Sequence, residues 1–239
     1  MNPKFRLFGG PNGSGKTSLF DYLKKNGVIN TELYINADRY ERELKANFSF
    51  NFNAYRVKVS QEDFLAYINS SSLYKKMKDQ TFIKDITIQA GVLKFNLPGE
   101  EINSYHASFI ASYLADKLFE TNQSFCFETV MSHESKIELL ELAKSKNYKT
   151  YLYFVYTDDP ELNVLRVKLR ASMGLHNVNS EVVRKRYKRS FELLPKALKF
   201  VDRAYIINNS DVFKVVAEKR DGLLFIKEKI SNILQRLLK

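Results

Sequence analysis

Residues 10–17 have the types and spacing of a site for a nucleoside triphosphate. They read GPNGSGKT and match the pattern G-x-x-x-x-G-K-[ST] at every fixed position. Glycines let the backbone curl so that N–H groups point at phosphate oxygens, and a helix that begins near Lys16 adds the positive end of its dipole. Lys16 would reach the β- and γ-phosphates, while Thr17 would offer its hydroxyl to Mg²⁺. We therefore expect ATP and Mg²⁺ as cofactors, with the nucleotide held by Gly10, Pro11, Asn12, Gly13, Ser14, Gly15, Lys16, Thr17 and Ser18.

Two acidic residues follow apolar segments that read as strands. Asp38 comes after ELYINA, and Glu128 lies in SFCFETV, directly before Thr129. Open α/β sheets bind ligands at the carboxyl ends of their strands, so Asp38 fits a general base for an acceptor hydroxyl. Alternatively it caps the next helix, because Asp38 and Glu41 have capping-box spacing. Glu128 is either a contact for sugar hydroxyls or the metal shell, or an ordinary turn residue. No strand ends in the apolar run with Asp-Glu that usually holds Mg²⁺ in ATPases.

Arginines concentrate in the segment that follows Pro160. Arg166 and Arg170 are four residues apart, so they share one face of a predicted helix. Gly174 ends that helix, and His176 reads as a turn or packing residue. A second helix carries Arg184, Arg186 and Arg189. The two helices predict a lid at about 160–190 whose arginines stabilise charge on a transferred phosphate; the alternative is a solvated basic face.

The spacing of apolar residues predicts the elements that position these side chains. Strands are expected at 4–9, 32–37, 124–130, 150–156 and 203–208, and helices at 18–26, 135–147 and 160–173. This alternation indicates an α/β protein with the three-layer P-loop NTPase/kinase fold: a parallel sheet of about five strands, a helical lid and a helical insertion. We expect one domain over residues 1–239. The insertion would cover about 39–120, with helices at 38–47, 61–68 and 104–120. The tail, residues 222–239, reads as an amphipathic helix.

The composition is that of a globular protein with a basic surface. Of the 239 residues, 44% are hydrophobic and 27% charged, and the net charge is +11. No apolar run is long enough for a membrane span and the N-terminus lacks an apolar signal region, so we expect no membrane association and a cytoplasmic location. The single cysteine, Cys126, excludes an internal disulfide and reads as a buried residue. The basic clusters at 166–170 and 184–189 favour local phosphate chemistry, which makes nucleic acid an unlikely partner.

Taken together, the motifs resemble the zeta-toxin family of P-loop kinases. The matching pieces are GGPNGSGKTS, INADRY, FETVMS, RVKLRASMGLHNV, RKRYKRSFELL and AYIINNS, in the family's order over residues 5–210. The resemblance implies transfer of the ATP γ-phosphate to the 3′-hydroxyl of UDP-N-acetylglucosamine, and inhibition by a small antitoxin. It implies Lys16 and Thr17 as phosphate and Mg²⁺ residues and Asp38 as the base. It also implies Glu128 and Thr129 as acceptor-sugar contacts, and Arg170 with Arg166 as γ-phosphate arginines.

The expected function is therefore an ATP-dependent small-molecule kinase, a phosphotransferase with an alcohol group as acceptor and a nucleotide sugar as substrate. Residues 39–120 match no motif of the family, yet they would form much of the acceptor pocket. Two alternatives remain. The net charge of +11 is compatible with a polynucleotide or RNA kinase. A nucleotide-binding interaction module would use the same phosphate loop without a base that faces an acceptor.

Overall fold

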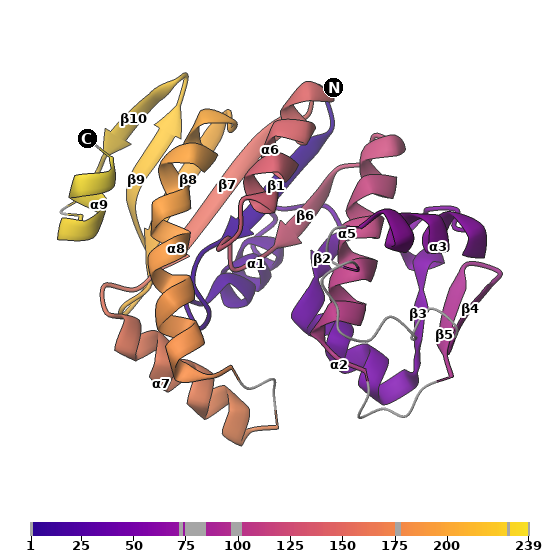
Figure 1. The fold of residues 1–239 in the computed structure, drawn as a ribbon. Helices are drawn as coiled ribbons and strands as arrows, with labels where there is room; N and C mark the ends of the chain where they lie inside the picture. The colour runs from indigo at the N-terminus through magenta and orange to yellow at the C-terminus, as the bar shows by residue number, and fades with distance from the viewer. Residues whose placement is uncertain are drawn as a thin grey trace. The chain divides into compact units, whose positions relative to one another are not determined.

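The computed structural model describes residues 2–71, 74, 85–96, 102–174, 178–228 and 230–238. The chain forms two compact units (Figure 1). The first contains Met1–Tyr34 and Ser124–Lys239, and the second contains Ile35–Gln123. The chain passes from the first unit into the second within strand β2 (Tyr34–Asn36). Within the described residues, no helix has the length and apolarity that crossing a membrane requires.

The first unit is built on a sheet in which seven described strands lie in the order β10-β9-β8-β7-β1-β6-β2 (Figure 1). Strand β1 (Lys4–Gly9) runs parallel to β6 (Phe125–Glu128) on one side and to β7 (Lys149–Tyr156) on the other. Strand β8 (Arg203–Asn208) continues the parallel series beside β7. The five strands predicted from the sequence are all present, and the α/β fold class is confirmed.

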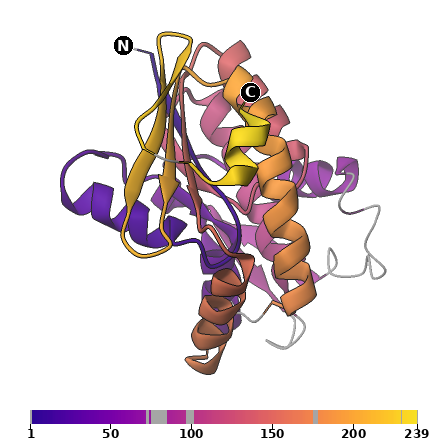
Figure 2. The ribbon, with the colours of Figure 1, turned by 90° about the vertical axis from the view of Figure 1, so that its left-hand side faces the viewer.

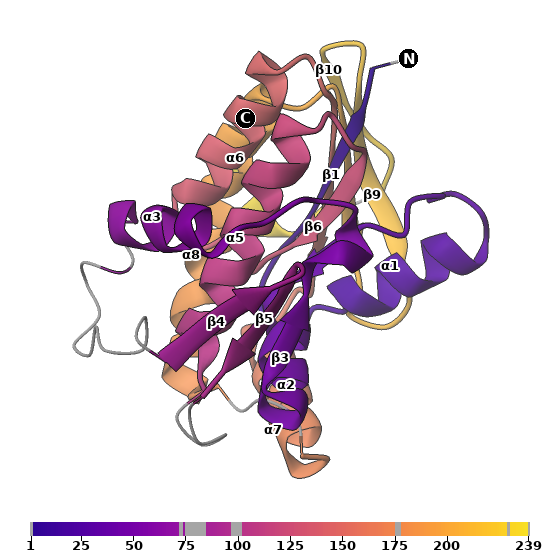
Figure 3. The same ribbon diagram turned by 90° about the vertical axis from the view of Figure 1, so that its right-hand side faces the viewer.

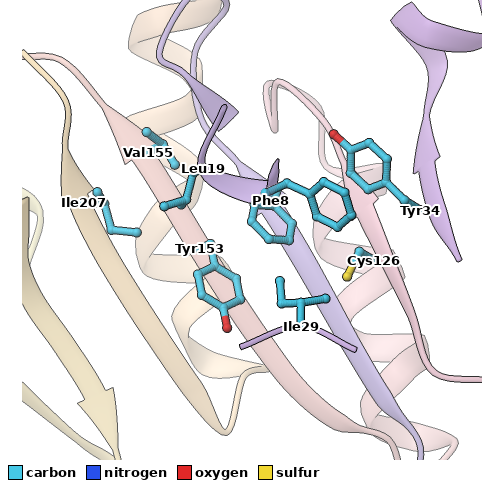
Figure 4. Packing of buried hydrophobic residues seen from close by; sticks show 9 residues of the cluster. Phe8, Leu19, Ile29, Tyr34, Cys126, Tyr153, Val155 and Ile207 are labelled. Atoms are coloured by element: carbon cyan, nitrogen blue, oxygen red, sulfur yellow. The ribbon is translucent and has the colours of Figure 1, made fainter. Parts of the chain in front are cut away.

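Helices cover both faces of this sheet (Figure 2). Helix α1 (Lys16–Lys25) lies on one face, and α6 (Ser135–Ser145) and α8 (Ser180–Lys199) lie on the other. Alternation along each strand divides the core between the two faces. On the α1 side, the ring of Phe8 stacks on that of Tyr153 with centroids 4.7 Å apart (Figure 4). On the other side, the ring centroid of Phe154 of β7 lies 5.4 Å from that of Phe191 of α8. Helix α7 (Pro160–Ser172) precedes α8 in the chain and packs on it.

The C-terminal segment differs from the prediction, and the expected helix over 222–239 is wrong. Strands β9 (Lys214–Arg220) and β10 (Leu223–Ile226) form an antiparallel hairpin at the edge of the sheet (Figure 2). Among the described residues of this tail, the helical ones are those of α9 (Asn232–Leu237). The turn consists of Asp221 and Gly222, with φ of 51° and 79°. Asp-Gly is a preferred pair where both turn residues need positive φ, so the sequence carried a signal for this hairpin that helical periodicity obscured.

The second unit combines helices with a small antiparallel sheet of order β3-β5-β4 (Figure 3). Its described α-helices are α2 (Ala37–Asn47), α3 (Gln61–Ser70) and α5 (Ser104–Glu120), close to the predicted bounds. The strands β3 (Ser49–Asn51), β4 (Ile86–Gln89) and β5 (Val92–Phe95) are three or four residues long and were not predicted. Its core is aromatic: the ring of Phe52 packs edge-on against those of Phe64 and Tyr113, with ring centroids 5.8 Å apart in both pairs.

Candidate nucleotide site

The phosphate loop joins the carboxyl end of β1 to the start of α1, and its glycines are required by its geometry. Gly10 has φ of +136°, and a Cβ there would lie 2.0 Å from the carbonyl oxygen of Val155. Gly13 has φ of +72°, and its Cβ would lie 2.7 Å from the carbonyl oxygen of Asn163. Side chains are strained at such φ values, so the loop keeps its shape only with glycine at these positions.

The first turn of α1 is available to an anion. Its N-cap residue, Gly15, is left-handed with φ of 95°, no side chain caps the helix, and its first turn has no acidic residue. The first N–H groups of a helix lack partners within the helix and carry the positive end of its dipole. An uncapped start therefore suits phosphate oxygens.

Lys16 is buried against the loop that it belongs to. It is 6% exposed, and its Nζ donates to the carbonyl oxygens of Gly10 at 3.0 Å and Pro11 at 2.7 Å. Two other buried polar atoms of the loop, Asn12 Oδ1 and Ser14 Oγ, have no hydrogen-bond partner among the described residues. Buried polar groups are rarely left without partners. The loop therefore fits a ligand that brings its own polar atoms, as a triphosphate does.

Two asparagines from other elements hold the loop in place. Asn163 of α7 donates from Nδ2 to the carbonyl oxygen of Asn12 at 2.6 Å. Asn209, which follows β8, donates from Nδ2 to the carbonyl oxygen of Ser14 at 2.8 Å. In the structure, Asn209 supports the phosphate loop.

Glu128 stands at the end of β6, the strand beside β1, and meets Thr17 there. Thr17 Oγ1 donates to both carboxylate oxygens of Glu128 at 3.0 Å, and the Tyr34 hydroxyl also donates to this carboxylate. A hydroxyl and a carboxylate at a phosphate loop are the oxygen ligands that Mg²⁺ takes together with phosphates and water. The described residues contain no group of three or more His, Cys, Asp or Glu that would hold a metal without the nucleotide.

Thr129 continues the ladder between β6 and β1. Its backbone N–H donates to the carbonyl oxygen of Phe8 at 2.9 Å, and its Oγ1 accepts from the Met131 N–H at 3.4 Å. These contacts fix where Glu128, its neighbour, lies.

Asp38 lies in the first turn of α2, in the second unit. The N-cap of α2 is Asn36, whose side chain accepts from the Arg39 N–H at 3.1 Å. The alternative that Asp38 caps this helix is therefore wrong, because that position lies two residues earlier. A carboxylate in a first turn is still favourable toward the helix dipole. Asp38 as a general base stays a prediction.

The arginines of α7 and α8 divide into different environments. Arg166 donates to the carbonyl oxygens of Asn209 at 2.8 Å and Ser210 at 3.2 Å, so it is tied to the segment that holds the loop. Arg170 is half-buried on the same helix, one turn later. Residues 175–177, with His176 in the predicted lid turn, lie outside the described residues.

Arg184 links the two helices of the predicted lid. Its Nε and Nη2 donate to the two carboxylate oxygens of Glu161 at 2.6 and 2.8 Å, and its Nη1 donates to Glu181 at 2.5 Å. The hydrogen bonds from Arg184 lower the pKa of the Glu161 carboxyl. A bidentate pair of this kind orients two helices.

Comparison with known proteins shows which family and which solved structures the chain resembles. A family model described as Zeta toxin matches residues 100–230, more than half of the chain. A crystal structure of AvrRxo1-ORF1:-ORF2 with ATP is similar in fold, with a TM-score of 0.59 at 14% identity over 95% of this chain. This chain spans 61% of that protein's length. A structure of the PezAT chromosomal toxin–antitoxin system of Streptococcus pneumoniae gives a TM-score of 0.56 at 16% identity, covering 99% of this chain and 78% of the other.

No curated protein matches the chain significantly in sequence. The identities with the solved structures are low enough that they establish the fold alone. The family model does not include the phosphate loop, which lies before residue 100, and that loop has the geometry described above. Because the family model matches residues 100–230, more than half of the chain, and the fold is that of a P-loop kinase, this chain belongs to the zeta toxin family.

Proposed function

We propose that this protein is an ATP- and Mg²⁺-dependent phosphotransferase that phosphorylates an alcohol group of a small molecule, a nucleotide sugar such as UDP-N-acetylglucosamine. The observation that carries the proposal is the contact of Thr17 with Glu128 beside a glycine loop shaped for phosphates. We place the activity in the cytoplasm, where ATP is available.

In this proposal the loop binds the triphosphate and Lys16 exchanges its bonds to Gly10 and Pro11 for phosphate oxygens. Thr17 and Glu128 would hold Mg²⁺, which when bound neutralises charge on the phosphates. Arg170 stabilises the γ-phosphate during transfer. Arg166 assists from its bonds to the carbonyls of residues 209 and 210, which support a positioning role.

Asp38 is the proposed base. Its carboxylate takes the proton of the acceptor hydroxyl while the hydroxyl oxygen forms a bond to the γ-phosphorus. The bond between that phosphorus and the β-γ bridging oxygen breaks, and its electron pair leaves with ADP. Glu128 and Thr129 are proposed contacts of the acceptor sugar, with Glu128 shared with the metal shell.

Incubation with ATP labelled at the γ-phosphate and a panel of acceptors tests this function. The panel contains nucleotide sugars and an oligonucleotide with a free 5′-hydroxyl, which represents the polynucleotide kinase alternative. Label transferred to a nucleotide sugar is the expected result. Label on the oligonucleotide alone would mean that the acceptor is a polynucleotide end and not a nucleotide sugar. No transfer to any acceptor would favour the nucleotide-binding module.

Asp38→Ala should abolish transfer and leave ATP binding intact, while Lys16→Ala should lose both. Glu43→Ala provides a matched control, because Glu43 is another carboxylate of α2 that pairs with Arg39 at 2.7 Å. Full transfer by the Asp38 variant would exclude Asp38 as the base.

We also propose a small protein partner that inhibits the enzyme. The support is that the similar structures are of AvrRxo1-ORF1 together with ORF2 and of a toxin–antitoxin system. Expression with the product of a neighbouring small gene, followed by co-purification and the transfer assay, tests this proposal. Activity unchanged by every such product would oppose it.

A further inference from the structure

The sheet of the first unit carries a row of alternating aromatic and basic residues on the face where α1 lies. The strand register places Arg6 beside Tyr151, and Tyr151 beside Arg203. One row further along the strands, Tyr153 lies beside Tyr205, and their rings stack at 5.2 Å. These residues are far apart in the chain, and strand pairing alone brings them together.

Helix α1 covers only part of this face. Its Leu19 and Phe20 pack in one cluster with Phe8 and Tyr153, toward the carboxyl ends of the strands (Figure 4). The aromatic rings at the border of that cluster, Tyr151 and Tyr205, stay half-buried. At the hairpin the row of Tyr153 and Tyr205 meets an acidic residue, Glu218, which pairs with Lys227 at 2.6 Å. Beyond Glu218 the row ends at Phe225, which is 38% exposed.

A cleft of about 930 Å³ opens at the amino ends of these strands. Its lining includes six basic and two acidic residues, namely Lys4, Lys144, Lys149, Lys199, Arg203, Lys219, Asp202 and Asp221. Basic side chains therefore outnumber acidic ones in the cleft. Of the two acidic residues, Asp202 already pairs with Lys144 and accepts from the Thr150 N–H at 2.8 Å. Among the described residues, no salt bridge engages Lys4, Lys149, Lys199 or Arg203.

We infer that this cleft and the adjoining sheet face bind single-stranded nucleic acid. Lysine and arginine side chains neutralise backbone phosphates, and exposed aromatic rings on a sheet stack with unpaired bases. An acidic protein segment would pair with the cations, but its carboxylates would not stack on the aromatic rings of the row. The basic clusters at 166–170 and 184–189 made nucleic acid an unlikely partner by sequence, whereas the cations of the cleft come from separate strands and helices that only the fold brings together.

This surface is separate from the phosphate loop. The cleft is lined by Lys4, at the first residue of β1, whereas the loop follows Gly9 at the other end. A strand of this length spans roughly 17–20 Å. Nucleic-acid binding and phosphoryl transfer can therefore be measured and lost independently.

The test is fluorescence anisotropy with labelled oligouridylate and oligothymidylate of about 12 nucleotides, within the site sizes of single-strand-binding folds. Titrations of the full chain at several salt concentrations, without ATP, should give saturable binding that weakens steeply as salt rises. Comparing the two oligonucleotides distinguishes RNA from DNA as the preferred strand.

Two variants address the two kinds of contact. Lys149→Ala combined with Arg203→Ala should reduce the slope of log affinity against log salt by about 1.4, because each single-strand phosphate contact contributes about 0.7. Tyr205→Leu keeps an apolar side chain but removes the ring, and should weaken binding about tenfold with little change in slope. Lys185→Ala with Lys188→Ala, two exposed lysines of α8, controls for net charge. Circular dichroism and thermal unfolding check that each variant is folded.

Retention of binding in Lys16→Ala, and in wild type with excess Mg²⁺-ATP, is expected if the surface is distinct. No binding at about 50 mM salt, or equal losses in the cleft and α8 variants, would overturn the inference. Competition by ATP would assign the binding to the nucleotide site instead. If a polyglutamate peptide binds equally tightly and its binding also depends on Tyr205, the ligand of this surface is an acidic protein and not nucleic acid.

Discussion

The substitution Glu128→Gln isolates the contact on which the proposed nucleotide site depends. The change is nearly isosteric, keeps one oxygen that accepts hydrogen bonds, and removes the negative charge. Glu128 accepts from Thr17 at 3.0 Å and from the Tyr34 hydroxyl, so the substitution weakens these two contacts, while its similar size leaves the local packing in place.

The expected magnitudes differ between the free and the nucleotide-bound protein. In the free protein the variant weakens hydrogen bonds to a partly buried carboxylate, which costs about 1 kcal/mol of unfolding free energy. In the complex it removes a carboxylate from the metal shell. Even the loss of an outer-shell partner reduces metal affinity about 10–100-fold, which equals roughly 1.4–2.8 kcal/mol, so the loss of a ligand should cost at least as much. The variant should therefore lose most of the Mg²⁺-dependent part of ATP binding.

Isothermal titration calorimetry with ATP, in Mg²⁺ and in EDTA, measures this difference directly. Wild type should bind more tightly with Mg²⁺, and Glu128→Gln should bind similarly in both conditions. Tyr34→Phe is the matched control, because it removes the neighbouring hydrogen bond to Glu128 and keeps the carboxylate. If Glu128→Gln retains the full Mg²⁺ enhancement, the metal assignment is refuted.

Three further predictions concern the loop, the pH dependence and the thiol. Gly10→Ala should abolish ATP binding and lower the unfolding free energy by about 1–3 kcal/mol, whereas Gly27→Ala, also at positive φ but with open space around it, should keep ATP binding; calorimetry and urea unfolding check both. Although burial opposes the charge, hydrogen bonds lower the pKa of Asp202 below its ordinary value of 3.8. The stability that this carboxylate provides is thus present above its ordinary pKa and is lost as pH falls through its lowered pKa in the folded protein. In urea titrations, Asp202→Asn should therefore be about 1 kcal/mol less stable than wild type at pH 7, and the difference should disappear as the pH falls below that lowered pKa. Burial raises the pKa of the Cys126 thiol to about 12, so iodoacetamide should label it only after unfolding, as followed by mass spectrometry; rapid labelling of the native protein would contradict its burial.

Local patterns were sufficient for much of the fold. The strand at Lys4–Gly9 and the strand at Arg203–Asn208 were predicted with the bounds that the structure has. The phosphate loop is likewise local, because a fixed glycine spacing between a strand and a helix determines its shape. The hairpin of β9 and β10 was missed although Asp221-Gly222 marks it, since helical periodicity in the tail was given more weight. The short strands of the second unit have too few residues for alternation to be recognised.

The candidate site could be predicted from the sequence only in part. The sequence by itself determined that Lys16 and Thr17 belong to a phosphate loop, and it placed Glu128 at the end of a strand. Only the tertiary structure decided that β6 lies beside β1, which brings Glu128 to Thr17, and that Asn209 supports the loop across nearly two hundred residues of chain. It alone decided that Tyr151 and Arg203 lie side by side on one sheet face. The physical reason is that spacing along a chain specifies turns and helix faces, whereas the order in which strands pair is settled by the packing of the whole core.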